Sequence, residues 1–519
     1  MSSSFVPQGS IVTSPAPASE GLGASAPPAA SVIDRSDPRF EALKRGHNLR
    51  FPDTDAEAAG QIIVCSSAEE AASALQRVVA AGLRPTIRSG GHCYEDFVVN
   101  NPNGAILDLS TLNVVDTDPS GVFRIAPGVV LGEAYQVLYK RYGVTLPAGT
   151  CYMVGAGGHI SGGGYGLLSR LHGLTSDWLT AIDILTVDAN GKVINRRVDS
   201  KHDPDLFRAC RGAGGGNFGI ITGFRFEKLP TAPSESAEAG ISFSWASMTE
   251  AKFTRLLVAF GDYWATRGLD PDTWGLFAYL SLAAGRSFSI GAQFVNPDGT
   301  AKDLTVLHEF FDHFAKFDPE PIKNEAKESG ALTYRVAHRP WLNATLAGGG
   351  SGGGSRAKYK SAYMKKTFTP AECSAIYKYL NSPHLDAHGL FLSIDSYGGA
   401  INRPERVLDT ASAQRSSIMK LQWQCYWRNE QEDASRLKFM DDFFTAVYTG
   451  SHVGAEYQGT PMGERFEGCY MNYADVDMLR YPFWPQLFYG TGSLYPFLQQ
   501  VKKRYDPNNI FHSSMSVRA

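Results

Sequence analysis

The spacing of hydrophobic residues switches repeatedly along the chain between the period of a helix and that of a strand. Ser66 and Glu69 have the spacing of a capping box, and the apolar face that follows them ends at Gly82. A second helical face runs over residues 133–142 and stops at Gly143. These patterns predict two helices in the first third of the chain.

Short apolar runs between these helices and after them predict strands. Asn190-Gly191 lies between two such runs and is the strongest short signal for a β-hairpin. The predicted strands of this region are residues 84–88, 105–109, 122–126, 181–187, 192–196 and 220–226. The region is therefore of the α+β class.

A second region of alternating strands and helices follows a Pro- and Ser-rich stretch at residues 230–238, which we interpret as a linker. Its predicted strands are residues 277–282, 287–294, 391–395 and 419–427. Its predicted helices lie near residues 250–266, 301–316, 370–381 and 431–448. We expect an antiparallel sheet covered on one side by helices.

Three loops are far richer in glycine than an ordinary core element. They are Arg88-Ser89-Gly90-Gly91-His92, the run from Gly149 to Gly166, and the run from Arg211 to Gly219. Glycine loses much backbone entropy on folding, so such density indicates unusual dihedrals or a close approach of the backbone to another group. Successive N–H groups in such loops are able to cradle phosphate.

These loops, in this order, resemble the berberine-bridge-enzyme-like family of FAD-linked oxidases. Three further segments carry the resemblance: Asp205-Leu206-Phe207, Asn472-Tyr473-Ala474-Asp475 and the tail from Lys502 to Phe511. The resemblance covers nearly everything after residue 40. Within the family, the chain is similar to the hexose oxidases of teicoplanin-type glycopeptide assembly, which oxidise the primary alcohol of an amino sugar.

The resemblance implies a domain organisation. Residues 34–232 and 460–519 would form an FAD-binding domain of the vanillyl-alcohol-oxidase, or PCMH, type. Residues 240–459 would form the substrate domain, and residues 1–33 a disordered leader rich in Ser, Pro, Ala and Gly. The Gly/Ser run at 348–355 resembles an engineered linker, but a mobile native loop explains it equally well.

The resemblance also implies site residues. His92 would bond to the 8α-methyl carbon of the flavin and Cys151 to its C6 atom. The implied cofactor-binding residues are Arg88, Ser89, Gly90, Gly91, Gly155, Gly157, Gly158, Gly162, Gly216, Asn217, Gly219, Ile221, Tyr470, Asn472 and Asn508. Tyr473 matches the family's base and Tyr165 a second catalytic tyrosine. A phenol has an ordinary pKa of about 10, so such a base needs neighbours that stabilise phenolate, and no motif names them.

Other candidates have simpler structural interpretations. His159 and His172 are possible polar contacts to flavin or substrate, and residues 502–504 are most simply a solvated helix face. Trp423, Trp427, Tyr397 and Trp484 are possible pocket walls, although we expect most of them in the core.

The composition of the chain limits the classes of partner that it is expected to bind. The 519-residue chain has a net charge of −3, which gives no basic field for nucleic acid, and no apolar run long enough for a membrane span. Its seven scattered cysteines form neither a disulfide framework nor a zinc motif. We expect a cytoplasmic protein that takes a small glycosylated molecule and O2; oligomeric state stays open.

The predicted activity is hydride removal from the C6 primary alcohol of a hexosamine on a glycosylated antibiotic precursor, toward aldehyde and acid, with H2O2 as coproduct. The alternative is FAD-dependent oxidative cyclisation, or C–C or C–O coupling, of a non-sugar natural product. A carrier that retains FAD or a glycoside without turnover is a third, non-enzymatic interpretation.

Overall fold

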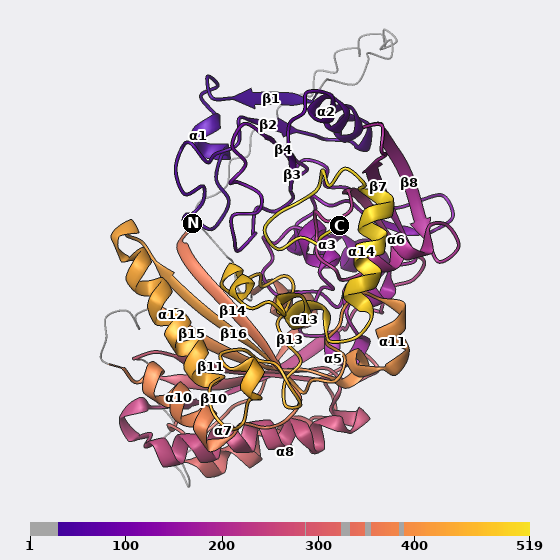
Figure 1. Ribbon diagram of the computed structural model, residues 1–519. Helices are drawn as coiled ribbons and strands as arrows, with labels where there is room; N and C mark the ends of the chain where they lie inside the picture. Colours follow the sequence, from indigo (N-terminus) through magenta and orange to yellow (C-terminus); the bar gives the residue numbers. More distant parts are fainter. Residues whose placement is uncertain (1–29, 286, 323–332, 348–353, 383–388) are drawn as a thin grey trace, which may run out of the picture.

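The computed structural model describes residues 30–285, 287–322, 333–347, 354–382 and 389–519. Two lobes lie one above the other in Figure 1. The upper lobe contains a four-stranded and a five-stranded sheet, and the lower lobe contains a seven-stranded sheet. The chain starts in the upper lobe, passes through the lower one and returns to the upper lobe at its end.

The four-stranded sheet has the order β1-β2-β4-β3. The bounds are β1 Ser31–Asp34, β2 Gln61–Val64, β3 Pro85–Arg88 and β4 Ala105–Asp108. Strands β2, β4 and β3 are parallel, and β1 pairs antiparallel with β2. Residues 31–33 are therefore part of a strand and not of a leader, because they complete the edge of this sheet; residues 1–29 lie outside the described residues.

Helix α2 (Ala68–Ala80) begins one residue later than the capping-box spacing predicts. The N-cap is Ser67, whose side chain accepts a hydrogen bond from the backbone N–H of Glu70. The Glu70 carboxylate in turn accepts from the backbone N–H of Ser66. The capping pair is thus Ser67 with Glu70 and not Ser66 with Glu69.

The five-stranded sheet has the order β5-β6-β9-β7-β8 and confirms the predicted hairpin. Its strands are β5 Val115–Thr117, β6 Phe123–Ile125, β7 Ala181–Val187, β8 Val193–Asp199 and β9 Ile220–Phe226. The helices of this lobe are α1 Phe40–Leu43, α3 Leu131–Tyr142, α4 Ala156–Ser161, α5 Ser169–His172 and α6 Pro204–Ala209, with the 3-10 turn η1 Thr175–Trp178. Helix α3 ends at Gly143, whose φ of +67° suits glycine.

The C-terminal segment packs on this upper lobe. Helices α13 (Trp484–Tyr489) and α14 (Leu494–Tyr505) follow the turn η10 (Val476–Arg480), and α14 runs beside α6. Lys502 is buried, and its ammonium donates to the Asn217 carbonyl at 2.7 Å and to Asp506 at 2.6 Å. The expectation of a solvated face at residues 502–504 is wrong for Lys502, because this cation ties the tail to the third glycine loop.

The lower lobe is an antiparallel sheet of order β13-β10-β12-β11-β15-β16-β14, as predicted. Its strands are β10 Glu235–Phe243, β11 Leu276–Ala283, β12 Phe288–Phe294, β13 Ala337–Pro340, β14 Arg356–Met364, β15 Leu390–Ser396 and β16 Met419–Trp427. Its helices are α7 Glu250–Ala265, α8 Thr305–Phe314, α9 Trp341–Ala347, α10 Pro370–Leu380, α11 Pro404–Asp409 and α12 Asp433–Val447. Helices α7, α8, α10 and α12 lie on the side of the sheet away from the upper lobe (Figure 1).

The predicted linker is wrong at residues 235–238, because these residues pair with β12 and β13 in the sheet. Trp423, Trp427, Tyr397 and Trp484 are all buried in the core, as expected. The Gly/Ser run lies outside the described residues except for Gly354 and Ser355.

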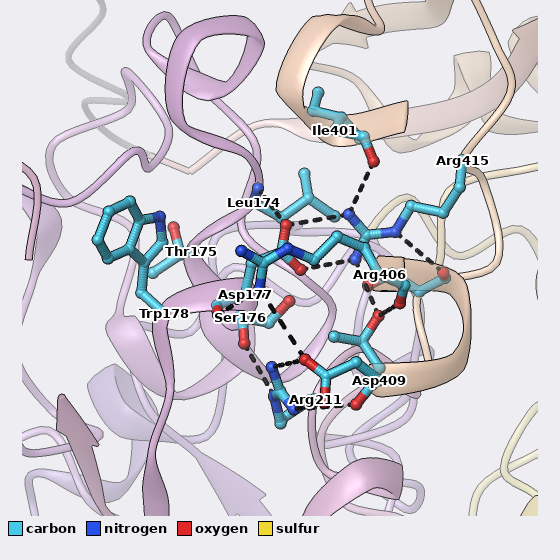
Figure 2. Close-up of polar contacts among 12 residues, drawn as sticks. Leu174, Thr175, Ser176, Asp177, Trp178, Arg211, Ile401, Arg406, Asp409 and Arg415 are labelled. Carbon is cyan, nitrogen blue, oxygen red and sulfur yellow. Dashed lines mark hydrogen bonds and ion pairs between the residues drawn. The ribbon is translucent and has the colours of Figure 1, made fainter. Parts of the chain in front are cut away.

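A cluster of ion pairs joins the two lobes (Figure 2), and the pair of Arg415 with Asp177 is fully buried. Arg415 binds both carboxylate oxygens of Asp177 at 3.0 and 2.7 Å, and Arg211 binds both of Asp409 at 3.0 and 2.9 Å. Asp177 belongs to η1, and the neighbouring N–H groups of Thr175 and Ser176 donate to the carbonyls of the turn that precedes Tyr165. The cluster therefore fixes that turn against the lower lobe.

The seven cysteines all lie in the described part of the chain, and each is a free thiol. Within those same residues, no helix combines the length and the apolar character that crossing a membrane requires. No group of three or more His, Cys, Asp or Glu side chains in the described ranges is arranged to hold a metal ion.

Candidate active site

A cavity of about 1010 Å³ lies between the two lobes. The first and second glycine loops, the third loop and the Tyr470–Ala474 segment line one side of it, and the open face of the seven-stranded sheet lines the other. Every predicted site residue lines this cavity except Gly162 and Asn508. Segments far apart in the sequence therefore meet at one place.

The first two glycine loops touch each other through their backbones. A Cβ atom on Gly90 would lie 2.4 Å from the Gly155 nitrogen, and one on Gly155 would lie 2.2 Å from the Ser89 hydroxyl. That hydroxyl donates to the Pro127 carbonyl at 2.5 Å. Gly158 differs, because a Cβ there would meet nothing within 4 Å and would point into open space. Its lack of a side chain leaves cavity space for a ligand.

His92 is held as a neutral imidazole. Its ring stacks on that of His47, with 3.6 Å between the centroids and an interplanar angle of 18°. Burial, and secondarily His47, lower the pKa of His92 to about 4. Its Nε2 atom is buried and has no hydrogen-bond partner among the described residues. A half-buried, uncharged imidazole on the cavity wall fits a nucleophile.

Cys151 exposes its thiol to the cavity. Protein packed around it raises the pKa of the thiol, and the charge of Lys420 opposes that rise. The second loop thus places a thiol within electrostatic reach of the tyrosines and the lysine described below. An imidazole, a thiol and an open backbone cradle on one cavity fit a flavin dinucleotide bound to His92, Cys151 and the loops.

Several of the predicted cofactor-binding residues use their side chains for hydrogen bonds within the protein. Arg88 donates to Asp108 at 2.8 Å and to the Leu43 carbonyl at 2.5 Å, which shapes the first loop. Asn217 donates to the Ala213 carbonyl and accepts from the backbone N–H of Val517, so its amide holds the third loop and the tail. These side chains support the cradle from behind.

Gly162 and Asn508 lie outside the cavity lining. A Cβ on Gly162 would lie 2.0 Å from the amide oxygen of Asn472, so the glycine makes room for that side chain. Asn472 uses this position to donate to the His159 carbonyl at 3.0 Å. Asn508 donates to the carbonyl of Ala189 at 3.1 Å, on the turn of the β7–β8 hairpin.

Three polar side chains of the cavity wall, Tyr473, Lys420 and Asp395, form a triad. The ammonium of Lys420 lies 2.9 Å from a carboxylate oxygen of Asp395 and donates to the Tyr473 hydroxyl at 3.4 Å. It also lies 4.7 Å from the centroid of the Tyr473 ring and 4.6 Å from that of Tyr165. Burial, followed by the charge of Asp395, raises the pKa of Tyr473 well above that of a free phenol. The resting side chain is therefore a neutral phenol beside a cation.

Hydrogen bonds and ring contacts hold the other tyrosines near the triad in the cavity wall. The Tyr165 hydroxyl donates to the Ser396 carbonyl at 2.5 Å, so its proton is engaged with the protein. Tyr470 accepts from Asn472 at 3.1 Å and packs its ring edge-on against Tyr473 at 4.9 Å. Tyr94 lies on another side of Tyr473, 5.4 Å between centroids.

The two histidines left open in the sequence differ in position. His159 lines the cavity, and its Nε2 accepts the backbone N–H of Gly149 at 3.1 Å. His172 does not line it. Burial lowers the pKa of each to about 4, so both are neutral near pH 7.

A buried ion pair network links the segment of His92 to that of Tyr473. Lys358 donates to Glu95 at 2.8 Å and lies 2.7 Å from Asp475. Glu95 follows His92 by three residues, and Asp475 follows Tyr473 by two. Since all three side chains are almost fully buried, this lysine fixes the separation of the two segments.

Sequence reasoning missed Lys420 and Asp395. Both lie on strands with no motif of their own, and they meet only through the pairing of β15 with β16. A signal was present, since Lys420, Gln422 and Gln424 put polar side chains on alternate positions of an otherwise apolar strand. Such alternation indicates a sheet face that borders a cavity or solvent.

Comparison with known proteins agrees with this geometry. An FAD binding domain model matches residues 59–196, and the model described as berberine and berberine like matches residues 469–518. Aclacinomycin-N/aclacinomycin-A oxidase of Streptomyces galilaeus is 33% identical over 96% of this chain and 92% of its own length. Hexose oxidase of Chondrus crispus is 33% identical over 94% of this chain and 95% of its own.

Among solved structures, a glycopeptide hexose oxidase complexed with teicoplanin superposes with a TM-score of 0.82. It is 33% identical, and the match covers 95% of this chain and 100% of that one. The fold is thus that of an FAD-binding domain of the PCMH type with an added substrate domain. The chain belongs to the berberine-bridge-enzyme-like family of FAD-linked oxidases.

Proposed function

We propose that this protein oxidises the primary alcohol of a hexosamine carried by a glycosylated natural product, and passes the electrons to O2. The observation that carries the proposal is the triad of Tyr473, Lys420 and Asp395 in the wall of the cavity. Similarity over nearly full length to a hexose oxidase and to a glycopeptide hexose oxidase supports the substrate class.

The triad is suited to remove a proton from an alcohol. Tyr473 is the base, and the ammonium of Lys420 stabilises the phenolate form that accepts the proton. Asp395 holds the ammonium of Lys420 in place through a contact of 2.9 Å. The Tyr165 hydroxyl donates its hydrogen bond to the Ser396 carbonyl, and its ring lies beside the ammonium of Lys420. Tyr165 is therefore a positioning residue. When bound, the flavin supplies the hydride acceptor and the route of the electrons to O2.

We further propose that FAD is bonded to both His92 and Cys151. Each bond would replace a C–H bond of the flavin and the N–H or S–H bond of the side chain, and the two electrons released for each bond would go to O2. The two bonds should form with different pH dependence. Because the pKa of His92 is about 4, the His92 bond should form equally fast from about pH 6 to pH 9. The Cys151 bond needs thiolate, and burial raises the pKa of this thiol, so its formation should speed up as pH rises.

The measurement uses apoprotein from a flavin-depleted host, mixed with FAD at each pH. Cys151→Ala isolates the His92 bond and His92→Ala isolates the Cys151 bond. Flavin absorbance that stays with the denatured chain gives each rate. A His92 bond whose formation slows steeply below pH 7 would contradict the neutral-imidazole account.

Anaerobic mixing with a glycopeptide bearing a free hexosamine 6-hydroxyl tests the substrate. We expect the yellow flavin to bleach and H2O2 to appear when O2 is readmitted. The mass of the product distinguishes sugar oxidation to the acid from oxidative cyclisation or coupling. Oxidation to the acid adds oxygen, whereas cyclisation or coupling only removes hydrogen. Bleaching by an unrelated alcohol and not by the glycopeptide would remove the sugar assignment.

A further inference from the structure

Tyr279 presents an aromatic ring to the cavity that no part of the proposed mechanism uses. It lies on β11, lines the cavity and is 39% exposed, which makes it one of the few large exposed apolar side chains among the described residues. A Cβ on Gly291 of the next strand would lie 2.5 Å from its Cζ atom. The phenol ring therefore lies directly over a glycine, in a place that any other residue would fill.

The register of the sheet places this ring at a defined distance from the triad. Gly240, Gly291, Tyr279, Asp395 and Lys420 are successive partners in one row across β10, β12, β11, β15 and β16. Neighbouring strands lie about 4.8 Å apart, so the Cα atoms of Tyr279 and Lys420 lie about 10 Å apart along the row. The Tyr279 ring, which lies over Gly291, is about one strand spacing further from Lys420. The reacting carbinol must lie within about 3 Å of Tyr473. A sugar whose carbinol lies at Tyr473 therefore does not reach Tyr279, and Tyr279 is free to contact the group attached to that sugar.

Hydrogen-bonding groups border the aromatic ring. Gln293 is the pairing partner of both Glu238 and Phe277, two rows from Tyr279 and therefore on the same face of the sheet. It is only 4% exposed, and its Oε1 atom is buried without a hydrogen-bond partner among the described residues. A buried acceptor without a donor is costly unless a ligand supplies one. Gln293, Glu238 and Tyr279 all line the cavity.

We propose that Tyr279, Gly291 and Gln293 form an outer subsite for the ring to which the reacting sugar is attached. That ring packs one apolar face on Tyr279 and donates an O–H or N–H at its edge to Gln293. This inference rests on the proposed oxidation of a sugar at Tyr473. It assigns the substrate class as a glycoside or oligosaccharide rather than a free hexose.

The test measures binding to the holoenzyme in its reduced form without O2, which is unable to turn over. Calorimetry compares N-acetylglucosamine, its β-1,4-linked dimer and its phenyl glycoside. We expect the dimer and the phenyl glycoside to bind about tenfold more tightly than the free sugar. Tyr279→Ala should abolish this difference and leave affinity for the free sugar unchanged.

Two variants sharpen the result. Gln293→Leu should weaken binding of the dimer, whose second ring carries hydroxyl groups at its edge. It should leave the affinity for the phenyl glycoside unchanged. Tyr334→Ala is the matched control, because Tyr334 lies outside this cavity and bonds Asp312. Equal affinity of the wild type for all three ligands, or a difference that persists in Tyr279→Ala, would overturn the subsite. Turnover of the hexosaminide would then still stand, so the two proposals fail separately.

Discussion

Tyr473→Phe should lower kcat/KM for sugar oxidation by about 10²- to 10⁴-fold, the usual contribution of a positioned general base. The substitution removes one oxygen and keeps the ring, which packs edge-on against Tyr470 and lies near Tyr94. Flavin content should therefore be unchanged. The rate of flavin bleaching after anaerobic mixing with substrate measures the effect directly.

Tyr397→Phe is the control for that experiment. Tyr397 is buried, and its hydroxyl donates to the Gln414 carbonyl, away from the cavity lining. Its loss should cost about 1 kcal/mol of stability and little rate. If the two variants bleached at the same rate, Tyr473 would not be the base.

Lys420→Met should have the second large effect, because it removes the cation that favours phenolate at Tyr473. Burial and Asp395 already raise the pKa of Tyr473, so this phenol is neutral at low pH and loses its proton only as pH rises. The rate should increase with pH in the wild type. In Lys420→Met, the same rise should begin at higher pH and the rate at pH 7 should be far lower.

The Lys420 experiment needs a partner variant, because Asp395 would be left largely buried without its cation. An orphaned buried charge destabilises by about 3–5 kcal/mol. Lys420→Met with Asp395→Asn removes that cost. Because Asp395 raises the pKa of Tyr473, the reference for the double variant is Asp395→Asn alone, and the rise of the rate with pH should begin at higher pH in the double variant than in that reference. Lys420→Arg retains the charge and should restore part of the rate. The same pH profile in the double variant and in Asp395→Asn would show that Lys420 acts only on folding.

Local signals predicted most of the elements and one part of the site. The Asn190-Gly191 turn, the helix stop at Gly143 and the alternating strand Met419–Trp427 all appear where the pattern predicts them. Each depends on residues adjacent in sequence. The glycine density predicted only a ligand or a close backbone contact, and the family resemblance was needed to expect His92 and Cys151 at one place; both line the cavity.

Long-range contacts explain what the sequence did not predict. Lys502 reads as part of a charged helix face, yet its partners are the Asn217 carbonyl and Asp506 inside the protein. The triad has the same origin, since Lys420 and Asp395 become neighbours only when β15 pairs with β16. Ser31–Asp34 becomes a strand because β2 offers an open edge. Neither propensity nor periodicity records such pairings.

In our proposal, the imidazole of His92 and the thiol of Cys151, from separate loops, hold the same flavin. The direct measurement is the intact mass of acid-denatured protein, with its visible absorbance, for the wild type, His92→Ala, Cys151→Ala and the double variant. We expect the mass of one FAD and a yellow chain in the first three, and a colourless chain of unmodified mass in the last. A colourless wild-type chain, with the pigment released into the supernatant, would contradict the claim.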